Sequence, residues 1–157
     1  MQSVIRRHRL VYFSAGLMLC SMLAAQAAEY DPVEIIKYRR SVMKSQREHM
    51  AAALAIIQGK VGYTNQLANH IRSLEETTGD IASLFPANSR TGDTRAMDAV
   101  WTGNAEFQLR ARDAQQKSAA LAKTFAAGET QNYSSRLNDL LESCKSCHKD
   151  FRKEEVK

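Results

Sequence analysis

Cysteine is scarce in this sequence, and its scarcity excludes several kinds of site. Of the three cysteines in 157 residues, Cys20 lies near the N-terminus, whereas Cys144 and Cys147 lie close together near the C-terminus. A disulfide between these two would close a very small loop and would stabilise the fold little. A structural zinc site needs four ligands, and only His49 and His70 lie far upstream of the pair.

The sequence also lacks strand patterns, internal repeats and low-complexity segments. A thioredoxin-like redox pair requires a βαβ setting with its first cysteine at a helix N-terminus, whereas Cys144 lies late in a predicted helix. A large excess of positive over negative charge is missing as well once residues 1–27 are set apart. Residues 1–27 hold three of the 22 basic residues and none of the 17 acidic ones, so the remainder is nearly balanced. Nothing in this balance indicates a nucleic-acid partner.

The N-terminal segment has the layout of a secretory signal peptide. Arg6, Arg7 and Arg9 precede an apolar stretch over 10–25, and small residues follow at an A-x-A site. We expect cleavage after Ala27, which leaves one domain over 28–157. An uncleaved membrane anchor is the alternative. Polar and small residues interrupt the apolar stretch and no stop-transfer flank follows it, so no stable membrane insertion is expected.

The most informative motif is Cys-x-x-Cys-His at Cys144, Cys147 and His148. This spacing is typical of covalent attachment of a c-type haem. Each thiol can add across one vinyl group of the porphyrin, and the adjacent imidazole then becomes an axial ligand of the iron. The sequence therefore predicts one covalent haem c, with His148 as its proximal ligand.

Four amphipathic segments follow the predicted signal peptide, and short turns separate them. The first begins at Asp31, where an acidic cap precedes Pro32, and ends in the glycine-containing stretch 58–62. The second is expected over 63–85, the third over 97–125 and the fourth over 133–151. Apolar residues three and four positions apart in each segment predict an all-α, antiparallel up-down-up-down four-helix bundle. Both cysteines fall on the predicted inner face of the last helix.

Met43 is the candidate for the opposite side of the iron. The first and last helices of such a bundle run antiparallel, and a rise of about 1.5 Å per residue places Met43 near the height of His148. His49 and Met50 lie about two turns too far along, and Met50 and Met97 are expected in the core. A thioether is a soft ligand that favours ferrous iron, but methionine also fills gaps in cores. Both interpretations of Met43 stay open here.

Two arginines precede Met43 by about one turn. Arg40 falls on the predicted inner stripe, where an unpaired charge is costly. Haem propionates would supply a partner, and the alternative is a surface ion pair with Glu34 or another acid. Arg152, one turn beyond His148, is expected near the proximal side of the haem.

The chain resembles the class II cytochromes c, the group of cytochrome c′ and cytochrome c-556. The resemblance rests on the late Cys144–His148 motif followed by Phe151 and Arg152, and on the run 36–43 in the first helix. Leu84-Phe85-Pro86 and Trp101 support it, and it covers essentially all of 28–157. It implies a haem c bundle in the bacterial periplasm, with Arg39 and Arg40 near the propionates and Met43 on the distal side.

The resemblance also implies two alternative functions. In the c-556 type a methionine ligates the iron, and the protein transfers one electron between redox partner proteins of the periplasm. In the c′ type the residue at this position only shields a five-coordinate iron that binds NO or CO. The run from Val42 to Met50 favours the first type, which we take as the expected function. No distal acid–base residue is placed near Met43, so no enzymatic activity is expected, and the chain should be a monomer or a homodimer.

Overall fold

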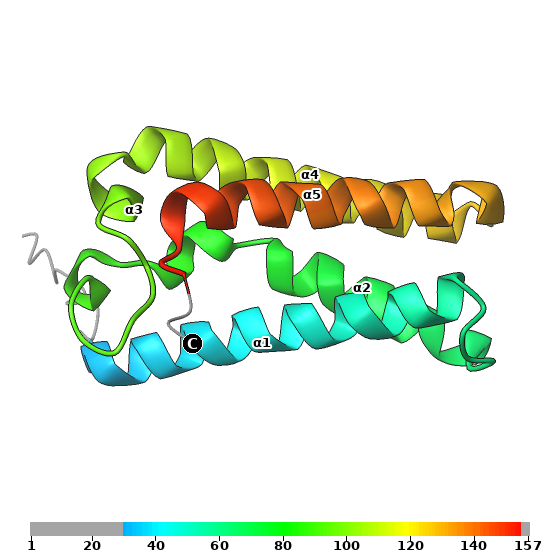
Figure 1. The fold of residues 1–157 in the computed structure, drawn as a ribbon, viewed down its shortest axis with the longest axis horizontal. Coiled ribbons are helices and arrows are strands. Elements are labelled where there is room, and N and C mark those ends of the chain that lie inside the picture. The colour runs from blue at the N-terminus through cyan, green and yellow to red at the C-terminus, as the bar shows by residue number, and fades with distance from the viewer. Residues whose placement is uncertain (1–29, 155–157) are drawn as a thin grey trace, which may run out of the picture.

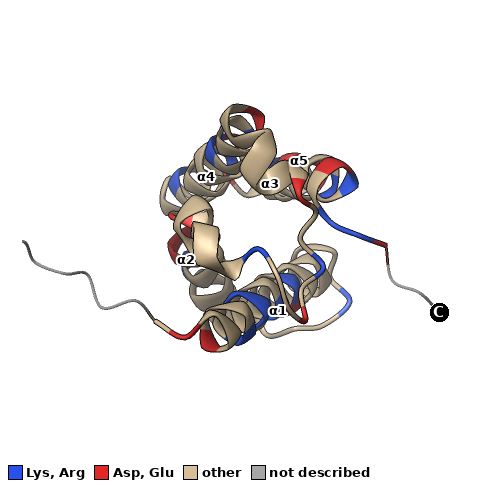
Figure 2. Cartoon of the chain, turned by 90° about the vertical axis from the view of Figure 1, so that its left-hand side faces the viewer, with Lys and Arg blue, Asp and Glu red and all other residues tan. Residues whose placement is uncertain are grey.

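Four long helices form the body of the molecule, which the computed structural model describes over residues 30–154. They are α1 (Pro32–Ile57), α2 (Leu67–Thr78), α4 (Asn104–Ala126) and α5 (Tyr133–Phe151), and a single turn, α3 (Ala99–Thr102), precedes α4. Consecutive long helices run in opposite directions along the bundle (Figure 1), and seen end-on they lie around a common axis (Figure 2). The prediction of an all-α, antiparallel four-helix bundle is confirmed. The predicted signal peptide over 1–27 lies outside the described residues.

The first helix begins where the sequence predicts it. The Asp31 side chain accepts a hydrogen bond from the Val33 backbone N–H at 2.8 Å, and Pro32 occupies the first helical position. The cap satisfies one of the amide groups left without a partner at a helix start, and proline has no amide to satisfy there. At the other end Gly59 adopts a positive φ of 68°, a conformation that glycine adopts without the steric cost of a Cβ.

The second helix is shorter than predicted. It ends at Thr78, and a 3₁₀ turn over Ile81–Leu84 replaces the expected last turns. A further 3₁₀ turn over Ala87–Ser89 follows Pro86. The hydroxyls of Thr77 and Thr78 donate back to carbonyls of the preceding turn, and Gly79 follows, a residue that favours helix poorly. The apolar spacing that predicted a helix to position 85 is real, but local backbone preference ends the helix earlier.

The third predicted helix is broken in two. Gly103 separates α3 from α4, and a Cβ at this position would lie 3.0 Å from the carbonyl oxygen of Ala99. The break lets the short helix turn away from the axis of α4 and cover one end of the bundle (Figure 1). Hydrophobic spacing that continued through Gly103 concealed this break in the sequence.

The buried core has two parts. The larger cluster fills the half of the bundle near the α1–α2 and α4–α5 turns, with Leu74, Leu121, Leu137 and Leu140 at 1% exposure or less. The smaller cluster consists of Val100, Phe107 and Phe151 and lies at the end where α5 finishes. Cys147 packs against the smaller cluster and Cys144 against the larger, so the predicted attachment motif lies between the two.

Over residues 30–154 none of the helices combines the length and apolar character that crossing a lipid bilayer requires.

Candidate functional site

The predicted attachment motif lies on the last turns of α5. Cys144 and Cys147 are half-buried thiols that form no disulfide in the structure. Burial raises the pKa of Cys144, and burial together with the nearby Cys144 raises the pKa of Cys147 to about 11. Reactive redox cysteines have a lowered pKa. The two thiols are thus protonated at neutral pH, which argues against a dithiol redox site.

His148 follows directly and is also half-buried. Burial, with smaller contributions from the positive charges of Arg152 and Arg95, lowers the pKa of His148 to about 4. The imidazole is therefore neutral at physiological pH and keeps a nitrogen lone pair, which is the form that ligates a metal.

A short antiparallel contact fixes the chain just beyond His148. The Met97 N–H donates to the carbonyl of Phe151 at 2.9 Å, and the Lys153 N–H donates to that of Arg95 at 2.8 Å. The Arg95 guanidinium donates in turn to the Lys153 carbonyl at 2.7 Å. Arg152 lies between these bonds, exposed, one turn from His148. The sequence predicted Arg152 near the imidazole but gave no signal for Arg95.

An aromatic stack closes this end of the bundle. Phe107 lies edge-to-face against Phe151, with ring centroids 5.3 Å apart, and against Phe85, at 4.9 Å. Trp101 lies at the edge of Phe85 at 6.2 Å, and its indole N–H donates to the Phe85 carbonyl at 3.0 Å. The stack thus joins α5, α4 and the segment after α2, one turn from His148.

Arg39, rather than Arg40, is the buried arginine of α1. Arg39 is 3% exposed and donates to Ser89 Oγ and Thr94 Oγ1, both at 2.9 Å, and to the Leu84 carbonyl at 3.1 Å. The prediction that Arg40 faces inward is wrong, since Arg40 is exposed and forms an ion pair with Asp93.

The error arose from the register chosen for α1. The predicted stripe included Val33 and Arg40, but steps of three or four residues from Ile36 lead equally to Arg39 or Arg40, so the spacing alone did not decide between them. The buried residues are Ile36, Arg39, Met50, Ala53 and Ile56. Val33 is 53% exposed. The predicted role of Arg39 and Arg40 near the propionates stays a prediction.

Counting along α1 and α5 agrees with the predicted height of Met43 near His148, which stays a prediction. The Arg39 guanidinium lies over Phe85, and the aromatic stack connects Phe85 to Phe151. Met43 follows Arg39 by about 6 Å along α1, and His148 precedes Phe151 by about 4.5 Å along α5. Because the two helices are antiparallel (Figure 1), both steps lead toward the bundle centre. Met43 is half-buried there.

The other methionines and histidines lie elsewhere. Met50 belongs to the larger core cluster, as predicted, and Met97 is half-buried before α3. His49 and His70 contact each other across α1 and α2.

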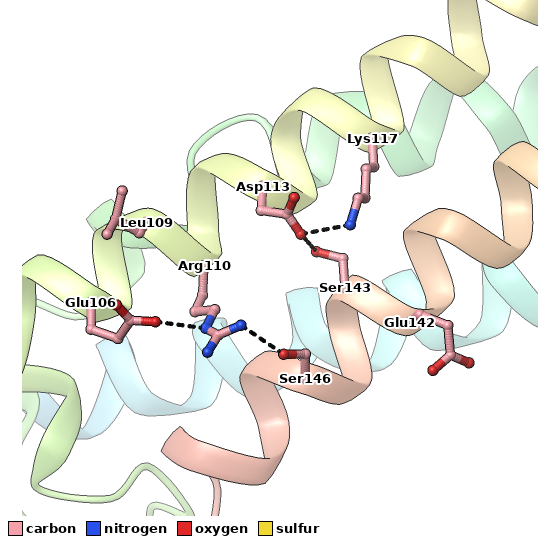
Figure 3. A pocket seen from close by; sticks show the side chains of 8 residues that line it. All are labelled: Glu106, Leu109, Arg110, Asp113, Lys117, Glu142, Ser143 and Ser146. Atoms are coloured by element: carbon pink, nitrogen blue, oxygen red, sulfur yellow. Dashed lines mark hydrogen bonds and ion pairs between the residues drawn. The ribbon is translucent and has the colours of Figure 1, made fainter.

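A polar network between α4 and α5 holds the outer side of the attachment motif (Figure 3). Arg110 donates to Ser146 Oγ at 2.9 Å, and its guanidinium also pairs with Glu106 at 2.9 Å. One turn away, the Ser143 hydroxyl donates to Asp113 at 2.6 Å, and Lys117 pairs with the same carboxylate oxygen at 2.9 Å. Ser143 and Ser146 each neighbour a motif cysteine, so the network orients this face of α5. The sequence gave no signal for it.

The donor set of this site fits a covalently attached haem. Two uncharged thiols and a neutral imidazole lie within five consecutive positions of one helix. An aromatic stack flanks them at one end, and Met43 on α1 is half-buried. Attachment of a haem through thioether bonds requires the two thiols, and axial ligation of its iron requires the imidazole. The aromatic rings supply apolar surroundings for the macrocycle. Cys144 and Cys147 would hold the haem, and His148 would ligate its iron.

Comparison with known proteins agrees with this assignment. A family model described as Cytochrome C′ matches residues 34–152. The cytochrome c′ of Rhodospirillum rubrum is 26% identical over 145 residues, which cover 92% of this chain and 97% of that protein. The cytochrome c′ of Rhodopseudomonas palustris is 30% identical over 124 residues, or 76% of this chain and 82% of that protein.

A solved structure shares the fold. A nitric oxide complex of a variant of cytochrome c prime from Alcaligenes xylosoxidans superposes with a TM-score of 0.74. Its sequence identity is 22%, and the match covers 81% of this chain and 100% of the other.

Proposed function

The chain belongs to the cytochrome c′ family, and we propose that it binds a diatomic gas, NO or CO, at the iron of its haem. Its cofactor is one covalently attached haem c, as in the family. The observation that carries the proposal is this membership, together with a relative of the same fold that forms a nitric oxide complex. We thereby prefer the gas-binding alternative to the electron-transfer function that the sequence favoured.

The residues of this chain have separate roles in the proposal. Cys144 and Cys147 would hold the macrocycle on α5, and His148, kept neutral by burial, would ligate the iron. When bound, the haem supplies an iron whose remaining coordination position can accept a small molecule. Met43, half-buried on α1, would shield that position from water. A thioether has no N–H or O–H to donate, so this side chain suits gases that need no hydrogen-bond donor.

A second function is supported by the residue count along α1 and α5, which puts Met43 near the height of His148. If the Met43 sulfur ligates the iron, the protein is a six-coordinate carrier that transfers one electron between periplasmic redox proteins. The two functions differ only in whether the Met43 sulfur coordinates the haem iron.

An absorption spectrum of the reduced, haem-loaded protein separates the two functions. We expect a broad high-spin spectrum that changes on titration with CO. A sharp low-spin α band, unchanged by CO, would instead establish ligation by Met43 and reject the gas-binding proposal.

The remaining assignments belong to the same proposal. We infer export to the periplasm through residues 1–27, a binding protein without catalytic turnover, and a monomer or a homodimer. Separation of the exported protein into periplasmic and membrane fractions, with N-terminal sequencing, tests the first point. Recovery in the membrane fraction with residues 1–27 retained would support the anchor instead.

A further inference from the structure

Two histidines outside the haem site meet on the surface of the bundle. The sequence contains four histidines. One, His8, lies in the predicted signal peptide, and His148 belongs to the attachment motif. The remaining two, His49 on α1 and His70 on α2, are separated by 21 positions, yet their Nδ1 atoms lie 3.0 Å apart.

The packing of α1 against α2 holds the two rings in place. The next residue on each helix is buried in the core, Met50 at 9% exposure and Ile71 at 2%. The Gln46 amide, about one turn from His49, donates at 2.6 Å to the carbonyl of Thr77, about two turns from His70, and joins the same two helices. The rings are tilted by 51°, with centroids 5.3 Å apart. Their approach is therefore set by the two backbones rather than by free rotation of exposed side chains.

A distance of 3.0 Å between two imidazole nitrogens restricts their protonation. One Nδ1 must carry a hydrogen and donate it, while the other must present its lone pair. Protonation of both rings would place two cations side by side. Burial, with a smaller contribution from the charge of His49, accordingly lowers the pKa of His70. The lowered pKa favours the neutral form of His70, whose ring can offer a nitrogen lone pair to a cation.

The same distance suits a bridging metal ion. Zinc–nitrogen bonds are about 2.0–2.1 Å long, so two nitrogens on a tetrahedral zinc lie about 3.3 Å apart. A shift of a few tenths of an ångström would therefore replace the shared hydrogen by a metal ion. Each ring would then carry its hydrogen on Nε2. The two rings are only half-buried, which leaves further coordination positions open to water.

We propose that His49 and His70 form a second metal site, which binds a divalent transition-metal ion such as Zn²⁺ or Cu²⁺ through both Nδ1 atoms. Imidazole suits these borderline ions, whereas Mg²⁺ and Ca²⁺ prefer oxygen ligands. Within residues 30–154 no group of three or more histidine, cysteine, aspartate or glutamate side chains gathers around a common point. The site has two protein ligands and completes its coordination with water. It is separate from the haem site, and it does not depend on the proposed function.

Calorimetric titration of the haem-loaded, exported protein with zinc chloride tests the site. Zn²⁺ is suitable because it takes no part in redox chemistry, and His148 is expected to be occupied by iron. We expect one zinc ion per chain. Either His49→Gln or His70→Gln should weaken binding roughly tenfold or more, because one of two ligands is lost. Asn69→Ala, which removes a neighbouring side chain bonded to Arg72, should leave the affinity unchanged.

Equal zinc affinity in the wild type and both glutamine variants, or no binding by the wild type, would overturn the proposal. A second measurement needs no variant. X-ray absorption at the zinc edge should show two imidazole ligands at about 2.0 Å in the wild-type protein. A coordination shell of oxygen atoms alone would also refute the site, and the haem iron does not contribute at this edge.

Discussion

The guanidinium of Arg39 lies over the ring of Phe85, with its Cζ atom 4.4 Å from the ring centroid. This contact joins α1 to the segment that follows α2, and through Phe107 it connects Arg39 to the end of α5. A buried cation at this position is stabilised by the aromatic face and by hydrogen bonds to Ser89 and Thr94. The height of α1 relative to the attachment motif depends on this connection.

Replacing Arg39 should destabilise the protein much more than replacing its neighbour. Arg39→Gln removes hydrogen bonds from a charged group and leaves buried acceptors without a donor, which we expect to lower the free energy of unfolding by about 2–3 kcal/mol. Arg40→Gln removes only an exposed ion pair and should cost less than about 1 kcal/mol. Urea unfolding of the two haem-loaded variants gives this comparison. An equal decrease in the free energy of unfolding in the two variants would show that the buried hydrogen bonds of Arg39 add no stability.

Truncation of Phe107 should open a cavity in the aromatic stack. Phe107 is 2% exposed and contacts Phe85 and Phe151, so Phe107→Ala should cost about 3–5 kcal/mol. That is a large share of the stability of a domain of this size. Leu109→Ala, on the exposed side of the same helix, is the matched control and should change stability by less than about 0.5 kcal/mol. Thermal unfolding measures both, and a small effect at Phe107 would contradict its central place in the core.

Asp113 should make stability depend on pH. The Ser143 hydroxyl, followed by Lys117, lowers the pKa of this carboxyl below its ordinary value of 3.8. A depressed pKa in the folded state means that the stabilisation is fully present above about pH 4 and disappears as the pH falls through the folded value.

The variant Asp113→Asn should therefore lose less stability than the wild type between neutral pH and about pH 3. The difference should be modest, because the carboxylate is partly exposed to water. Asp139→Asn, which lies on the exposed side of α5 outside this network, serves as the control. Parallel curves of unfolding free energy against pH for wild type and Asp113→Asn would disprove the linkage.

Met43→Ala distinguishes a shielding side chain from a ligand. If Met43 shields the iron, the variant keeps the spin state of the wild type and binds CO severalfold faster, because the entry path is wider. Met97→Ala removes another half-buried thioether but keeps the backbone hydrogen bond from Met97 to Phe151, and it should change neither property. Absorption spectra and CO association rates of the reduced proteins measure the effect. Conversion from low-spin to high-spin in Met43→Ala would show that its sulfur is a ligand.

Local signals in the sequence predicted most of the architecture. The cap at Asp31 and Pro32 marks the start of α1, and Gly59 and Gly128 follow the ends of α1 and α4. These features act within a few residues, so they can be recognised without the rest of the fold. Local signals at Gly79 and Gly103 were outweighed by an apolar pattern that continued through both, which is why α2 was predicted too long and the third helix unbroken.

The sequence alone determined the chemistry of attachment, since two thiols and an imidazole in one short motif need no distant residue to define them. It also determined a bundle of four helices, because the helical period is a local property. Only the tertiary structure decided which of two adjacent arginines is buried, which side chains brace α5, and that His49 meets His70. Each of these depends on contacts between residues far apart in the chain, and such contacts form only when the helices pack at a definite rotation and height.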